Sequence, residues 1–184
     1  MSKVYSNILW LLIDKVYLLV GGLIVTTLVA RYLGPSDLGK LNYGMVLASF
    51  IVVISQCGGS HVIYREAAKN KGRSLNYIYS SEMTRAIIFV LSSCLIFLFI
   101  YFIEPSFNDS LFITLVVLSY IFTGLDIFQY HFNGSLQSKE NAKTSVVGKT
   151  IGMLLRLLLV ITYANEFAFI IPIFIEGMVI WWLR

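Results

Sequence analysis

Charged residues are scarce in this sequence. Only 13% of its 184 residues are Asp, Glu, Lys or Arg, whereas 58% are hydrophobic and the mean hydropathy is +0.79. A soluble domain carries about 25% charged residues, because its surface has to be hydrated. The composition therefore excludes an ordinary soluble domain and indicates that much of the surface faces a lipid bilayer.

Sequence signatures of catalysis and of cofactor or metal binding are also lacking. No Walker-type phosphate loop, HExxH, CxxC or GxSxG motif is present. His61 and His131 are isolated, and Cys57 and Cys94 lie in apolar runs, where we expect small fillers rather than a disulfide. No basic patch interleaved with aromatic residues favours nucleic acid. We therefore expect a protein that is not an enzyme and needs no cofactor or metal.

Long apolar runs make up most of the chain instead. A membrane-spanning helix needs about 20 mainly apolar residues. The first run is too long for a secretory signal peptide, and Asp14 and Lys15 interrupt it. We predict an all-α polytopic membrane protein, a single bundle over residues 1–184 with six transmembrane helices at 8–31, 41–62, 85–103, 111–132, 146–163 and 167–183.

The distribution of Lys and Arg predicts the orientation, because cytoplasmic loops are enriched in these residues. With the N-terminus in the cytoplasm, the outer side holds only Arg31 and Lys40. The inner side then holds the larger set, which is Lys3, Arg65, Lys69, Lys71, Arg73, Arg85, Lys139, Lys143 and Arg184. We therefore expect the N-terminus to be cytoplasmic and Arg31 to lie at the outer face.

A short motif follows the first apolar run. The stretch "ARYLGPSDLGKLNYG" (residues 30–44) has an R-Y-L-G-P-x-x-x-G pattern and is preceded by "SNILWLLIDKV" (6–16). A glycine pair then opens an amphipathic basic loop, "CGGSHVIYREAAKNKG" (57–72). These segments resemble the start of the bacterial lipid-linked oligosaccharide flippases, which include the O-antigen flippases of the polysaccharide transporter family. Beyond residue 72 the resemblance is one of hydropathy.

The resemblance implies a fold, a cargo and a location. Members of that family have two helical lobes, and this chain is similar to the N-terminal lobe alone. The implied activity is flipping of polyprenyl-diphosphate-linked oligosaccharide, such as O-antigen repeat units, across the bacterial inner membrane by ion-coupled alternating access. The implied partners are this lipid-linked oligosaccharide, membrane lipids and the polysaccharide polymerase machinery. Two alternatives stay open: a multidrug-type cation-coupled antiporter lobe, and a truncated membrane protein that transports nothing.

Charged residues inside the predicted spans are the candidate site. A charge near the bilayer centre is costly, so such residues usually face a cavity or a partner. The set consists of Asp14, Lys15, Asp126, Lys149, Arg156 and Glu176. At about 100° per residue, two of these cations fall on one helix face, that of Ser145, Lys149, Gly152 and Arg156. A second polar stripe consists of Asp126, Gln129, Tyr130 and Asn133.

Two interpretations of this set are open. In the first, the three cations and three carboxylates neutralise one another and fix helix packing. In the second they line a hydrophilic cavity, where Lys15, Lys149 and Arg156 would bind the diphosphate of the implied substrate. Their carboxylate counterparts, Asp14, Asp126 and Glu176, would then bind protons or sodium ions.

Two further arginines lie at span ends. Gly34 and Pro35 are helix-stop signals, so Arg31 in the preceding turn has two interpretations, as a C-terminal cap or as a substrate contact at the outer mouth. Arg85 is a candidate contact at the inner mouth.

Overall fold

The chain folds into a bundle of helices. The computed structural model describes residues 2–103 and 106–184, and over these ranges it contains helices and no strands. The elements are α1 (Ser2–Gln56), α2 (Gly59–Lys69), α3 (Lys71–Ile103), α4 (Phe107–Ser119), α5 (Ile121–Leu125), α6 (Phe128–Gly134), α7 (Ser138–Ile161), the 3-10 turn η1 (Glu166–Phe169) and α8 (Ile170–Leu183).

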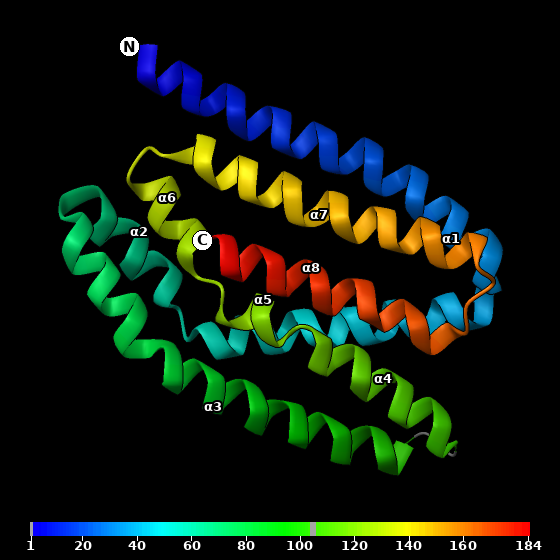
Figure 1. The fold of residues 1–184 in the computed structure, drawn as a ribbon. Coiled ribbons are helices and arrows are strands. Elements are labelled where there is room, and N and C mark those ends of the chain that lie inside the picture. Colours follow the sequence, from blue (N-terminus) through cyan, green and yellow to red (C-terminus); the bar gives the residue numbers. More distant parts are fainter. Residues whose placement is uncertain (1, 104–105) are drawn as a thin grey trace.

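The element α1 consists of two helices joined at a sharp bend. Gly34 has φ 76° and ψ 175°, a conformation that breaks the helix and that glycine adopts without a steric penalty. Pro35 follows and begins the second helix, where its missing N–H is tolerated. The two parts, residues 2–33 (the first leg) and 35–56 (the second leg), run antiparallel (Figure 1). The predicted stop at Gly34–Pro35 is confirmed.

The second leg ends earlier than the predicted span at 41–62. Cys57 and Gly58 have positive φ values of 47° and 69°, and the chain turns there into α2. Residues 59–69, predicted as part of a span and of a basic loop, form an amphipathic helix that buries Ile63, Glu66 and Ala67. The helix α3 likewise begins at Lys71, well before the predicted start at residue 85. The inner loop of the prediction is therefore helical.

The predicted fourth span, at 111–132, is discontinuous. A turn at Tyr120 separates α4 from α5, and Asp126 and Ile127 separate α5 from α6. The segment α6 is held against α3 by a short hydrogen bond between Ser74 Oγ and His131 Nδ1, 2.6 Å long. The following helix, α7, starts at Ser138, eight residues before the predicted span at 146–163.

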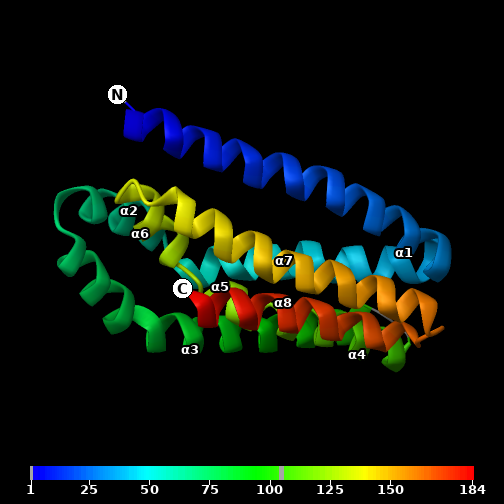
Figure 2. The ribbon, with the colours of Figure 1, turned by 45° about the horizontal axis from the view of Figure 1, so that its top comes forward.

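The helices lie side by side with their connections at two ends. The first leg packs on α7, and α7 packs on α8, while the second leg contacts α3, α4 and α5 (Figures 1 and 2). The start of α1, α2, the start of α3 and α6 lie at one end, which we call the basic end because Arg65, Lys69, Lys71 and Arg73 lie there. The bend of α1, the end of α3, the start of α4 and the link from α7 to α8 lie at the other end.

The outer surface of the bundle is apolar. Leu19, Leu23 and Val53 are each 70–72% exposed, and many other large apolar side chains are exposed with them. Within residues 2–103 and 106–184, five helical stretches are long and apolar enough to cross a membrane, and Ile8–Gln56 holds two such runs, one in each leg of α1. The chain is thus an all-α polytopic membrane protein.

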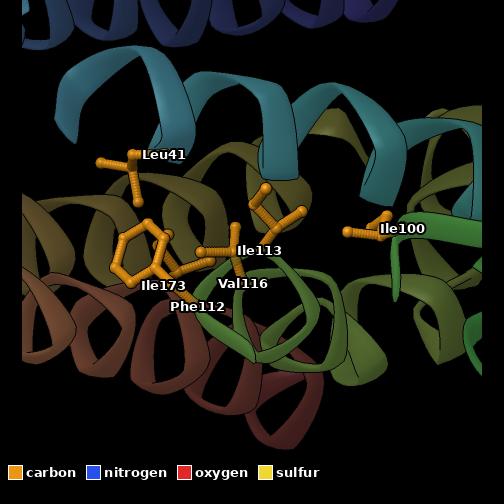
Figure 3. Close-up of a cluster of buried hydrophobic side chains, with 6 residues drawn as sticks. All are labelled: Leu41, Ile100, Phe112, Ile113, Val116 and Ile173. Carbon is orange, nitrogen blue, oxygen red and sulfur yellow. The ribbon is translucent and has the colours of Figure 1, made fainter. Parts of the chain in front are cut away.

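Apolar clusters hold the helices together inside the bundle. The largest joins the second leg to α3, α4 and α8 through Leu41, Ile100, Phe112, Ile113, Val116 and Ile173 (Figure 3). Gly44 lets α4 approach the second leg, since a Cβ at this position would lie 2.8 Å from the Val116 side chain. Cys57 and Cys94 are both free and exposed.

Candidate functional site: a polar cavity at the basic end

A polar cavity of about 330 Å³ opens in the half of the bundle nearer the basic end. Its walls come from both legs of α1, from the broken segment α5–α6 and from α7 and α8. Five charged side chains line it, namely Asp14, Lys15, Asp126, Lys149 and Arg184. Uncharged polar groups complete the lining, among them Gln56, Thr123, Gln129, Tyr130, Asn133, Asn141 and Ser145.

The helix break between α5 and α6 brings Asp126 into the cavity wall. Asp126 is 6% exposed, and its Oδ2 forms a close ion pair with Nη1 of Arg184. The Arg184 guanidinium also donates from Nε to Thr144 Oγ1 at 3.3 Å, so it links α7 to the break. Because this arginine is already engaged, it is not a free cation for a ligand.

Lys149 is the cation that α7 presents to the cavity. It is half-buried, and none of the carboxylates in the described ranges lies within 4.0 Å of its ammonium group. Ser145, one turn earlier on the same face, also lines the cavity. The helix therefore presents a desolvated positive charge that has no direct counter-ion, which is the arrangement that an anionic ligand group would complete.

The first leg of α1 forms the opposite wall. Asp14 is 5% exposed, while its neighbour Lys15 is exposed at the cavity rim. Oδ1 of Asp14 has no hydrogen-bond partner within the described part of the chain, and the same holds for Oδ1 of Asp126 and Oδ1 of Asn141. The three residues that carry these unpartnered acceptor oxygens all line one cavity, where a proton, a cation or water would satisfy such oxygens.

Arg156 and Glu176 lie outside the cavity and pair with each other. Nη2 of Arg156 lies 3.0 Å from Oε2 of Glu176, and the two side chains are 27% and 20% exposed. Gly152 makes this approach possible, because a Cβ there would lie 2.5 Å from Glu176 Oε2. The predicted polar face of α7 therefore divides: Ser145 and Lys149 line the cavity, and Arg156 packs against α8.

The two arginines at span ends also lie away from the cavity lining. Arg31 is exposed near the bend of α1, and its role at the outer mouth stays a prediction. Arg85 is 4% exposed and donates to Ser81 Oγ at 3.1 Å and to the Ile78 carbonyl at 3.0 Å, both on its own helix. A contact between Arg85 and substrate at the inner mouth stays a prediction as well.

Sequence reasoning missed four polar residues of the cavity wall, namely Gln56, Thr123, Asn141 and Arg184. Arg184 was expected only as one of the basic residues of the inner side, and Asn141 falls in a segment predicted to precede the fifth span. The only sequence signal for Asn141 is that it lies four residues before Ser145 and eight before Lys149, on the same helix face. Among the described residues, no group of three or more His, Cys, Asp and Glu side chains is placed to hold a metal ion.

Comparison with known proteins gives the family. A family model described as "polysaccharide biosynthesis protein" matches residues 4–179. The chain belongs to this family. No curated protein and no solved structure matches it. The match to the polysaccharide biosynthesis family covers all residues of the cavity wall except Ile180 and Arg184, so the cavity is a feature of the matched region.

Proposed function

We propose that this chain takes part in flipping a polyprenyl-diphosphate-linked oligosaccharide across the bacterial inner membrane, with its N-terminus in the cytoplasm. One observation carries the proposal: Lys149, a cation without a direct counter-ion, faces a polar cavity within an otherwise lipid-facing bundle. Membership of the polysaccharide biosynthesis family supports a role in polysaccharide biosynthesis. Members of this family are transporters rather than enzymes, which agrees with a role in moving a precursor across the membrane.

The chemistry of the cavity suits the phosphate end of such a substrate. Moving a diphosphate through hydrocarbon is costly unless its charge is compensated along the way. Lys149 and the rim residue Lys15 supply positive charge, and Gln129, Asn133 and Ser145 supply hydrogen-bonding groups for phosphate oxygens or sugar hydroxyls. The apolar polyprenyl chain can remain in the lipid, so the cavity needs to hold only the polar end.

The buried carboxylates of the same cavity suit a coupling ion. Asp14 and Asp126 each retain one buried oxygen without a hydrogen-bond partner among the described residues, and Asn141 adds a third acceptor. We propose that a proton or sodium ion binds Asp14 and Asp126 and that its release is coupled to substrate movement. Glu176, the third predicted carboxylate, is engaged by Arg156 and serves packing in this proposal.

Export of surface polysaccharide tests the proposal in cells. In a strain whose surface polysaccharide depends on the gene for this chain, Lys149→Met is expected to reduce export about tenfold or more, as a charge-assisted contact to phosphate is worth about 1.5–3 kcal/mol. Arg73→Met is the matched control, because Arg73 is exposed at the same end but outside the cavity. Normal export by Lys149→Met at a normal protein level would refute the role of the cavity.

A further inference from the structure

A second hollow, separate from the polar cavity, lies between the first leg of α1 and the start of α7. It has a volume of about 290 Å³, and its walls are the apolar side chains Trp10, Ile13, Tyr17, Ala142, Val146 and Val147, with parts of Asp14 and Lys143. Ile13 is 56% and Val147 46% exposed, so this groove opens on the lipid-facing surface. At one end Tyr17 OH and Thr150 Oγ1 are hydrogen-bonded at 2.6 Å and close the groove.

The opposite end of the groove is positively charged. Lys139 lies in the first turn of α7, and its ammonium is 5.5 Å from the centroid of the Trp10 ring, which the groove shares. Lys143, one turn later, lines the groove itself and contacts Glu140 at 3.2 Å. Both partners of that pair are more than half exposed, so the contact holds Lys143 only weakly.

An apolar groove with a cationic end has the shape and polarity of a lipid. We propose that the groove binds one anionic phospholipid, with an acyl chain between the first leg and α7 and the phosphate on Lys139 and Lys143. The lipid belongs to the leaflet at the basic end, where anionic headgroups meet the Lys and Arg residues of α2 and α3.

The placement of the first leg explains what such a lipid would do. This leg lies at the edge of the bundle beside α7 (Figure 2). Only 11% of the residues in the most apolar 18-residue stretch of α1 are buried. A lipid wedged along the contact with α7 would therefore stabilise the first leg against the rest of the bundle. Because Asp14 lines both the groove and the polar cavity, the lipid would also fix one wall of the cavity.

The test uses the purified full chain, stripped of lipid in detergent. Phosphatidylglycerol and phosphatidylcholine are added separately, and bound lipid is counted by native mass spectrometry. We expect the unaltered chain to retain one phosphatidylglycerol molecule in preference to phosphatidylcholine. The double variant Lys139→Gln/Lys143→Gln should weaken retention of phosphatidylglycerol about tenfold and leave that of phosphatidylcholine unchanged.

The matched control is Lys69→Gln/Arg73→Gln, which removes the same charge at the basic end outside the groove. Equal losses in the two double variants would overturn the proposal, because they would indicate attraction to net charge alone. Val146→Trp keeps every charge and fills the groove, so it should also abolish retention of phosphatidylglycerol. If Val146→Trp is folded by circular dichroism and retains the lipid normally, the groove is not the site.

Competition separates the other possible occupants. Inorganic phosphate should not displace the phospholipid, because the contact between the acyl chain and the groove adds affinity that phosphate alone lacks. Displacement by phosphate at the concentration that saturates an exposed lysine pair would overturn the proposal in favour of a bare anion site. Displacement by polyprenyl phosphate in equimolar amount would overturn it in favour of a substrate site. Lipid retention by the purified chain and export by Lys149→Met in cells are separate measurements, so a failure of one proposal is distinguished from a failure of the other.

Discussion

The ion pair between Arg156 and Glu176 predicts that a double substitution costs less stability than either single one. The two groups are 3.0 Å apart and 27% and 20% exposed. At an effective dielectric constant of about 20, charges at this separation attract each other by about 5 kcal/mol before desolvation is subtracted. Removing one partner of a buried pair typically costs about 3–5 kcal/mol, because the other charge is left uncompensated.

Partial exposure reduces the expected loss. We expect Arg156→Met and Glu176→Met each to lower the free energy of unfolding by about 2 kcal/mol, since the remaining charge keeps some contact with water. The double variant replaces the pair with apolar side chains of similar length and should lie within about 1 kcal/mol of the unaltered protein. The coupling free energy between the two positions is then about 3–5 kcal/mol.

Equilibrium unfolding in mixed micelles, followed by tryptophan fluorescence, measures the four proteins of this cycle. The exposed pair of Glu140 and Lys143 is the matched control, and its coupling free energy should stay below about 1 kcal/mol. If the double variant at Arg156 and Glu176 loses as much stability as the two single variants together, the pair does not couple and the reasoning is wrong.

The remaining predictions concern glycines. Gly134→Ala should destabilise the protein by about 1–3 kcal/mol, because its Cβ would lie 2.5 Å from the backbone carbonyl oxygen of Tyr64. The control is Gly22→Ala, whose Cβ would meet no neighbouring group within 4 Å, and it should not lower the stability of the protein. Gly34→Ala should cost about 1–3 kcal/mol, because φ 76° with ψ 175° is a backbone region that essentially only glycine occupies, whereas Gly39→Ala should cost nothing. Thermal unfolding of each variant in detergent measures these changes, and equal melting temperatures within either pair would contradict the argument.

Features set by local chemistry could be predicted from the sequence. The bend of α1 follows from Gly34 and Pro35, whose backbone preferences act without any distant contact. The polar stripe of Gln129, Tyr130 and Asn133 was also predicted, since these residues share one face of α6 and all three line the cavity. Which residues share a helix face depends on the local helix geometry, so it does not depend on how the other helices pack.

Features set by neighbouring helices could not be predicted. Lys149 and Arg156 share one face of α7, but Arg156 pairs with Glu176 of α8, whereas Lys149 lines the polar cavity. The pairing of Arg184 with Asp126 likewise depends on where the end of α8 meets the helix break. The break itself gives almost no signal, because no proline interrupts the apolar run of α4 and α5 and hydropathy averages over single turns.

The most direct test of the account is the affinity of the purified protein, in lipid nanodiscs, for a polyprenyl diphosphate. Lys149→Met is compared with the unaltered chain and with Arg73→Met, because Lys149 is the cation of the polar cavity that is proposed to bind the diphosphate. We expect Lys149→Met to bind about tenfold more weakly and Arg73→Met to bind normally, and we expect polyprenol without phosphate not to distinguish the three proteins. Equal affinity of Lys149→Met and the unaltered chain for the diphosphate would contradict this expectation.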